Sequence, residues 1–158
     1  MSQRIDLRYL AGIVDGEGCI SLHANHVNPH LNKHPRVVLH FSVSNTCRSL
    51  ILDIKEQFGG SVYTRLPKKQ DFKALPKYCY CWCLGERATV QLLKRLLPFL
   101  RVKQRQAKLA IEFQKIKDKY TSSRSGRPLG APLSEGEYKQ RLSLVRQCKL
   151  LNRVGGKG

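Results

Sequence analysis

The sequence is short of acidic residues, and this shortage is its strongest compositional feature. Among 158 residues, 11 Asp and Glu stand against 29 Lys and Arg, which gives a formal net charge of +18. An excess of this size on one folded chain predicts a polyanionic partner, because the positive charges otherwise only repel one another. The basic residues are spread along the chain and form no tail, so a folded basic surface for nucleic acid is the first expectation. An anionic membrane surface is the second.

Long apolar runs and zinc-like cysteine spacings are also absent from the sequence. No segment reaches the ~18 apolar residues of a membrane span, and the first residues lack the apolar core of a secretion signal. We therefore expect an intracellular protein with no membrane partner. The six cysteines form no C-x-x-C pair. Cys79, Cys81 and Cys83 alternate on an expected strand, where they point the same way and do not wrap a metal ion, so reduced thiols are expected.

Hydrophobic periodicity predicts an α+β fold with the order α-β-β-α-β-β-α, followed by two further helices. Asp6 caps the first helix, Asn45 or Thr46 caps the second, and Ser134 with Glu137 forms a capping box for the last. The expected helices cover 7–16, 47–58, 86–97, 103–120 and 135–152, and the expected strands cover 19–25, 36–44, 61–66 and 77–84. The expected organisation is a core over 1–120, a linker over 121–134 and a C-terminal helix over 135–158 packed on the core.

Each of the four strands has one apolar face, which the helices must cover, and one polar face. The polar face is either a plain solvated surface or a nucleic-acid surface, and the net charge favours the second. Arg36 and Arg65 are the best candidates for reading bases, because arginine fits the major-groove edge of guanine. Lys68, Lys69 and Lys73 lie in a loop and are expected to contact phosphates. The full set predicted to contact DNA is Ser21, His23, Asn25, Arg36, His40, Ser42, Ser61, Tyr63, Arg65, Lys68, Lys69, Lys77 and Cys79.

Two glycines four residues apart, Gly12 and Gly16, lie on one face of the first helix. Such a stripe lets a second helix approach closely. Packing against helices of the same chain is one explanation. Because the segment occurs once in the sequence, the same helix of a second subunit, related by a two-fold axis, is the simpler partner. The predicted dimer interface consists of Ala11, Gly12, Asp15 and Gly16.

Glu17 follows this stripe at the end of the helix. Two such helix ends, each with partial negative charge and a carboxylate, repel each other unless a cation lies between them. Oxygen ligands favour a hard divalent ion, and Mg²⁺ is the expected one. The alternative is that Glu17 is an exposed turn residue.

The segment LAGIVDGEG, residues 10–18, resembles the namesake motif of the LAGLIDADG homing endonucleases, and the order of elements is similar to the saddle-shaped core of that family. PFLRVKQRQA, residues 98–107, resembles the family segment that carries a catalytic lysine, which implies Lys103. FSVSNTCRSL, residues 41–50, resembles the stretch that places a polar and a basic residue near the cleaved phosphate, which implies Asn45 and Arg48. The resemblance also implies that the metal is held by Glu17 and the Gly16 carbonyl.

A single motif in this family implies a homodimer that cuts both strands of a long, near-palindromic DNA site and leaves short 3′ overhangs. Mg²⁺ is the implied cofactor, Mn²⁺ is expected to substitute, and Ca²⁺ is expected to bind without supporting cleavage. The implied location is the compartment that holds the target DNA, an organelle or a prokaryotic cytoplasm. Two alternatives stay open: a group I intron maturase that binds RNA, with or without DNA cleavage, and a transcription regulator that lacks the metal site. Glu17, Lys103 and Arg48 count against the regulator.

Overall fold

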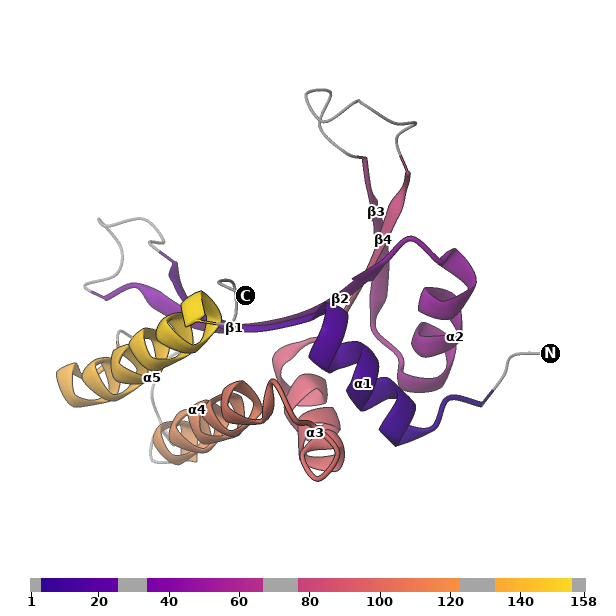
Figure 1. Ribbon diagram of the computed structural model, residues 1–158. Coiled ribbons are helices and arrows are strands. Elements are labelled where there is room, and N and C mark those ends of the chain that lie inside the picture. The colour runs from indigo at the N-terminus through magenta and orange to yellow at the C-terminus, as the bar shows by residue number, and fades with distance from the viewer. Residues whose placement is uncertain (1–3, 26–33, 67–76, 123–132, 155–158) are drawn as a thin grey trace.

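Four antiparallel strands form one sheet in the order β1-β2-β4-β3, in a computed structural model that describes residues 4–25, 34–66, 77–122 and 133–154. Figure 1 shows the β3–β4 pair turned away from the direction of β1 and β2. The strands are β1 (Gly18–Asn25), β2 (Arg36–Asn45), β3 (Ser61–Arg65) and β4 (Cys79–Cys83), and the helices are α1 (Leu7–Glu17), α2 (Arg48–Phe58), α3 (Glu86–Leu96), α4 (Gln104–Ser122) and α5 (Glu135–Val154). The predicted α+β class and element order are confirmed.

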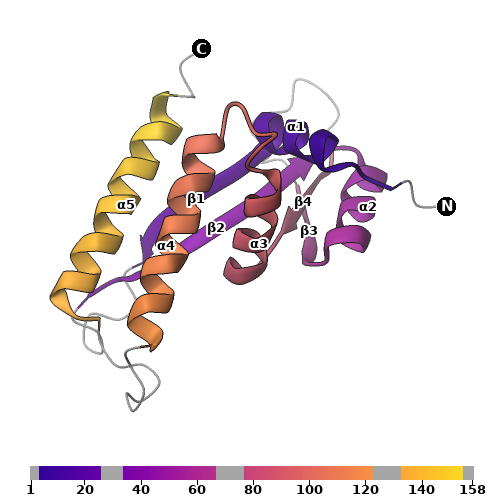
Figure 2. The same cartoon turned by 90° about the horizontal axis from the view of Figure 1, so that it is seen from below.

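The helices cover one side of this sheet and form the core with it. Figure 2, viewed from the helix side, shows α5, α4 and α3 side by side across β1 and β2, with α2 near β3 and β4. At the centre, Phe41 of β2 meets Trp82 of β4 edge to face, with ring centroids 5.5 Å apart. The Trp82 indole N–H donates to the Gly59 carbonyl at 2.7 Å. The apolar side chains predicted for β2, namely Val37, Leu39, Phe41 and Val43, are all buried.

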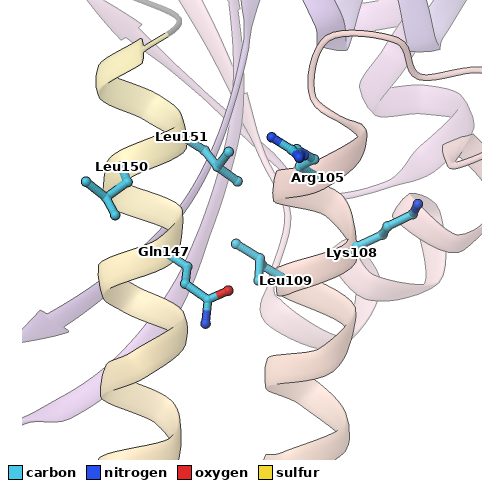
Figure 3. A pocket seen from close by; sticks show the side chains of 6 residues that line it. All are labelled: Arg105, Lys108, Leu109, Gln147, Leu150 and Leu151. Atoms are coloured by element: carbon cyan, nitrogen blue, oxygen red, sulfur yellow. The ribbon is translucent and has the colours of Figure 1, made fainter.

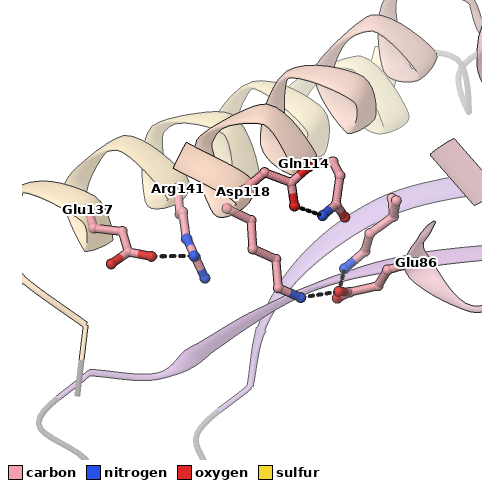
Figure 4. Close-up of polar contacts among 7 residues, drawn as sticks. Glu86, Gln114, Asp118, Glu137 and Arg141 are labelled. Carbon is pink, nitrogen blue, oxygen red and sulfur yellow. Dashed lines mark hydrogen bonds and ion pairs between the residues drawn. The ribbon is translucent and has the colours of Figure 1, made fainter. Parts of the chain in front are cut away.

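The C-terminal helix α5 packs against β1 and α4. The Asn152 amide donates to the Ile20 carbonyl of β1 at 3.2 Å, which ties the end of α5 to the sheet. At the start of α5, the Ser134 hydroxyl accepts from the Glu137 N–H at 3.3 Å, which is one of the two hydrogen bonds of the predicted capping box. The Glu137 carboxylate forms a buried ion pair with Arg141 (Figure 4). Both partners lie on α5, and removing one partner of a buried pair typically costs about 3–5 kcal/mol because the other charge is left buried and unpaired.

Polar contacts also fasten the inner helices. Glu86, at the start of α3, accepts from the Leu39 N–H of β2 at 3.1 Å. Its carboxylate, labelled in Figure 4, also forms an ion pair with Lys117 of α4. A shallow groove runs between α4 and α5 on the helix side; Figure 3 shows the side chains that line it: Arg105, Lys108, Leu109, Gln147, Leu150 and Leu151. In the described part of the chain, no helix combines the length and apolar character that crossing a bilayer requires.

Candidate active site and nucleic-acid interface

The C-terminal end of α1 carries an exposed carboxylate that a neighbouring strand holds in place. Glu17 is the last residue of α1, and Gly18 starts β1 directly after it. A Cβ at Gly18 would lie 2.5 Å from the Val14 carbonyl oxygen, so only glycine allows this abrupt change of direction. The Asn45 amide, at the end of β2, donates to the Glu17 carboxylate at 2.5 Å. Two of the residues predicted to be catalytic therefore contact each other.

Asn45 is itself fixed from its other side. Its carbonyl Oδ1 accepts from the Cys47 N–H at 2.7 Å, and Cys47 is the N-cap residue of α2. The prediction that Asn45 or Thr46 is this N-cap was wrong, because β2 continues through Asn45 and the turn into the helix then needs two more residues. Arg48, the first residue of α2, follows Asn45 by three residues, and its side chain is exposed to solvent.

Lys103 lies at the same end of α1, and Asp15 holds it there. The two carboxylate oxygens of Asp15 accept from the main-chain N–H groups of Arg101 and Lys103, at 2.7 and 2.9 Å. The Lys103 ammonium donates back to the Asp15 main-chain carbonyl. A cation is favoured at this position because the C-terminal carbonyls of a helix carry partial negative charge. The structure thus brings Glu17, Asn45 and Lys103 to one helix end.

The two glycines of α1 face open space. Gly12 and Gly16 are exposed, and a Cβ added at either would meet nothing within 4 Å. In the described part of the chain, no neighbouring helix lies close enough to require glycine at these two positions. Close packing against the chain's own helices therefore does not explain them. Ala11 is 0% exposed and belongs to the core, so its assignment to the interface is corrected. The Asp15 carboxylate accepts two hydrogen bonds within the chain. Its place in the interface, like that of the two glycines, stays a prediction.

Strand register places the residues predicted to contact DNA on the side of the sheet away from the helices. Ser21 pairs with His40 and Asn25 with Arg36, while Tyr63 pairs with the buried Cys81. Directly paired residues project to the same side. We name this side the polar sheet face; it consists of Ser21, His23, Asn25, Arg36, His40, Ser42, Ser61, Tyr63, Arg65 and Cys79.

Exposure on the polar sheet face is uneven. Ser21 and Ser42 are only 6% and 7% exposed, so their assignment as DNA contacts is corrected: the folded chain leaves almost none of their surface accessible. The Ser21 hydroxyl forms a 2.8 Å hydrogen bond with the exposed His23 ring, and His23 lies 6.2 Å from the His40 ring. Burial, then the charge of His23 and that of Arg65, lower the pKa of His40. Ser21 therefore holds the exposed His23 side chain from below.

Arg65 is presented in a fixed position at the β3–β4 end of this face. Its guanidinium donates to the Tyr63 hydroxyl at 2.9 Å and lies 5.3 Å from the centre of the Tyr63 ring. A hydrogen bond to Cys81, followed by burial, raises the pKa of Tyr63 to about 12, so the hydroxyl stays neutral. Two thiols lie beside this pair. Burial raises the pKa of Cys81, but hydrogen bonds, that with Ser44 first, outweigh burial and leave the pKa of Cys81 below its usual value. Burial raises the pKa of Cys83 to about 11.

The remaining DNA-contact predictions lie in the β3–β4 connection or at the start of β4. Lys77 is exposed and lies two residues before β4, and Cys79 begins that strand half-buried. Lys68 and Lys69 lie outside the described residues, as does Lys73.

Comparisons with known proteins match both the sequence and the fold. The chain is 32% identical over 114 residues to DNA endonuclease I-CvuI of Chlorella vulgaris, a stretch that is 71% of this chain and 65% of that relative. The chain belongs to the LAGLIDADG homing endonuclease family. The match therefore spans slightly less than two thirds of that relative's length. No protein-family model matches the chain.

Solved LAGLIDADG structures share this fold. A complex of I-CvuI with DNA in the presence of Mg superposes with a TM-score of 0.63 at 23% identity, covering 92% of this chain and 80% of that one. The homing endonuclease I-TnaI superposes with a TM-score of 0.60 at 16% identity, covering 96% of both chains. At these identities the structures establish the α+β architecture of this LAGLIDADG chain.

Sequence reasoning missed two residues that organise the site of this LAGLIDADG protein. Asp15 was assigned to the dimer interface, yet it anchors the segment that carries Lys103. Tyr63 was expected only to face DNA, yet it also holds Arg65. The contact of Tyr63 with Arg65 had a signal in the sequence, since residues two apart on a strand share a face. The contact of Asp15 with Arg101 joins segments more than 80 residues apart, and no sequence pattern indicated it.

Proposed function

We propose that the chain is a homodimeric, Mg²⁺-dependent DNA endonuclease that hydrolyses both strands of a long, near-palindromic site and leaves short 3′ overhangs. The observation that supports this most is the meeting of Glu17, Asn45 and Lys103 at the end of α1, directly beyond the open glycines Gly12 and Gly16. The end of α1 thus gathers the groups for cleavage beside an open surface for a second copy.

The donor set at this helix end suits Mg²⁺, because the Glu17 carboxylate and the Gly16 carbonyl are oxygen ligands. Among the described residues, no group of three His, Cys, Asp or Glu side chains is placed to hold a metal ion. At this helix end the proposed ligands from the described residues of one chain include a single carboxylate, Glu17, and a two-fold axis at the glycines would add the second Glu17. Bound Mg²⁺ supplies Lewis acidity toward a phosphate oxygen and toward water.

The protein side chains have separate tasks in this proposal. Asn45 orients the Glu17 carboxylate through the 2.5 Å hydrogen bond between them. Lys103 places a positive charge where negative charge develops on the phosphate, a contribution typically worth about 10²–10³-fold in rate. Arg48, exposed at the start of α2, orders solvent and phosphate beside Asn45. The polar sheet face holds the duplex in register, with Arg36 and Arg65 as readers of guanine.

Selection from a random duplex library tests this function and needs no known target sequence. Wild-type protein is incubated with the library in Mg²⁺, in Mn²⁺, in Ca²⁺ or with a chelator, and cut molecules are captured by their ends and sequenced. We expect near-palindromic sites with 3′ overhangs in Mg²⁺ and Mn²⁺, and no cleavage in Ca²⁺ or with the chelator. If no site is cut in Mg²⁺ or Mn²⁺ while the protein binds structured RNA tightly, the endonuclease proposal is wrong and a maturase takes its place.

A further inference from the structure

Residues 101–103, the last part of the connection between α3 and α4, are hydrogen-bonded to α1 through Asp15. After α3 ends, Leu100 is buried, but the next two side chains point outward, and Val102 is 68% exposed. Apolar packing therefore does not fix residues 101–103. The two oxygens of the Asp15 carboxylate accept from the main-chain N–H groups of Arg101 and Lys103 and hold this segment directly.

Lys103 is fixed through its main chain as well as its side chain. Its N–H donates to Asp15 at 2.9 Å, its carbonyl accepts from the Ala107 N–H at 3.0 Å and starts the hydrogen-bond ladder of α4, and its ammonium donates to the Asp15 carbonyl. A free lysine side chain has four rotatable bonds and places its charge poorly. Here Asp15 determines where the ammonium group lies.

Asp15 links the Lys103 ammonium to Glu17. Asp15 lies two residues before Glu17 on the same helix end, so the helix backbone sets the relation between the carboxylate and the cation. We infer that Asp15 is the positioning residue for Lys103 in strand cleavage, an inference that rests on the function proposed above. Asp15 contacts neither phosphate nor metal in this role; it acts through Lys103.

A purely structural role for Asp15 predicts different behaviour. Asp6, at the other end of α1, also accepts from a main-chain N–H, that of Arg8 at 2.6 Å. If Asp15 only stabilised the fold, Asp15→Ala and Asp6→Ala would behave alike. If it positions Lys103, Asp15→Ala slows the cleavage step while leaving DNA affinity unchanged, and Asp6→Ala does neither. Asp6→Ala is therefore the matched control.

Single-turnover cleavage of a selected site, with dissociation constants measured in Ca²⁺, tests the inference. Misplacing a catalytic group by about 1 Å can cost roughly 10²-fold in rate, so we expect a loss of that order for Asp15→Ala with affinity within about twofold of wild type. Asp15→Asn keeps one acceptor oxygen and should recover part of the rate. In a Lys103→Ala background, Asp15→Ala should cost nothing further. Losses that multiply in the double variant, or a loss of affinity at an unchanged rate, would overturn the inference.

Hydrogen exchange on the free protein, without metal or DNA, separates this inference from the proposed function. Asp15→Ala should speed exchange at the amides of Arg101 and Lys103, and Asp6→Ala should leave both unchanged. If these amides exchange at the wild-type rate in Asp15→Ala, Asp15 does not hold the segment and the inference fails even in an active nuclease. If exchange rises as expected but wild-type protein cuts no DNA, the proposed function fails and the positioning role falls with it.

Discussion

The end of α1 and the polar sheet face differ in how their polar groups are held. At the end of α1, the main chain fixes each group: Asp15 binds two main-chain amides, and Asn45 binds a third while it holds Glu17. On the polar sheet face, side chains project from regular strands and contact mainly other side chains, as Arg65 contacts Tyr63. A rigid site suits chemistry, and a projecting one suits recognition. Changes at the helix end should therefore alter rate, and changes on the sheet should alter affinity and specificity.

Glu17→Gln should give the largest effect and separates the two regions most cleanly. The amide keeps the shape of the side chain and removes the anionic metal ligand, so cleavage should fall by more than the roughly 10²–10³-fold typical of losing one electrostatic group. DNA affinity without metal should not fall, because a repelling charge is removed. Glu56→Gln, an exposed residue of α2 with the same charge change, is the control. Cleavage at the wild-type rate in Glu17→Gln would contradict the assignment.

Gly12→Leu tests whether α1 also forms the dimer. A Cβ added there meets nothing within 4 Å in the described part of its own chain, so the monomer should stay folded. A leucine that is forced against a second helix costs about 1–3 kcal/mol of dimer stability, and a two-fold symmetric dimer contains this clash twice. Gly136→Leu, at an open glycine of α5, should leave assembly unchanged. Analytical ultracentrifugation at low micromolar concentration measures the result, and a persisting Gly12→Leu dimer would place the interface elsewhere.

Lys103→Ala should retain DNA binding and lose roughly 10²–10³-fold in cleavage rate. The exposed Lys108 of α4 provides the matched substitution, Lys108→Ala, which should cut at the wild-type rate. Rates are compared on fully bound DNA. Weakened binding with an unchanged rate would make Lys103 a phosphate clamp and place it with the recognition residues.

Arg65→Ala and Arg36→Ala should give the opposite pattern. Each should relax preference at one position of each half-site, by about 1–3 kcal/mol, with little change in rate on the best site. Lys68→Ala should weaken binding to all sequences alike and flatten the salt dependence. Measuring cleavage across single-base variants of the site distinguishes loss of sequence preference from uniformly weaker binding. Equal scaling of every site by both arginine variants would mean that the polar sheet face does not read sequence.

Acidification should produce the smallest effect. It should lower the free energy of unfolding and raise the affinity for DNA. The pKa of His40 lies below its usual 6.5 in the folded chain, so in the window just below 6.5 the unfolded chain binds more protons. Stability from His40 is thus fully present above that window and is lost as pH falls through it. Phosphates favour the protonated ring, so DNA affinity should rise over the same range. Denaturation and binding titrations at about pH 5 and pH 7.5 test both signs, with His40→Asn as control.

Sequence patterns predicted the elements well because each pattern is local. Alternation in β2 identified Val37 and Phe41 as core residues, and both are about 1% exposed. The same alternation assigned Ser42 to the correct side but not its burial, which depends on neighbouring strands. Helical spacing placed Ala11 with the core residues Leu10 and Val14, yet the motif also suggested it for the interface. Only the structure shows that it is fully enclosed.

Contacts across long separations lay beyond such patterns. The carboxylate of Asp15 meets amides 86 and 88 residues away, and periodicity carries no information on such a pair. The resemblance to the family motif nominated Glu17, Asn45 and Lys103 separately. Their common location, and the absence of any intrachain need for Gly12 and Gly16 among the described residues, came from the three-dimensional arrangement.

Anomalous scattering from Mn²⁺ in crystals of the protein bound to a selected DNA site tests the central claim most directly. The account predicts a two-fold symmetric dimer joined at α1, with Mn²⁺ bound by the Glu17 carboxylates of both subunits beside the phosphates to be cleaved. Mn²⁺ bound elsewhere, at the histidines of the polar sheet face for example, or a dimer in which the two α1 helices lie apart, would contradict it.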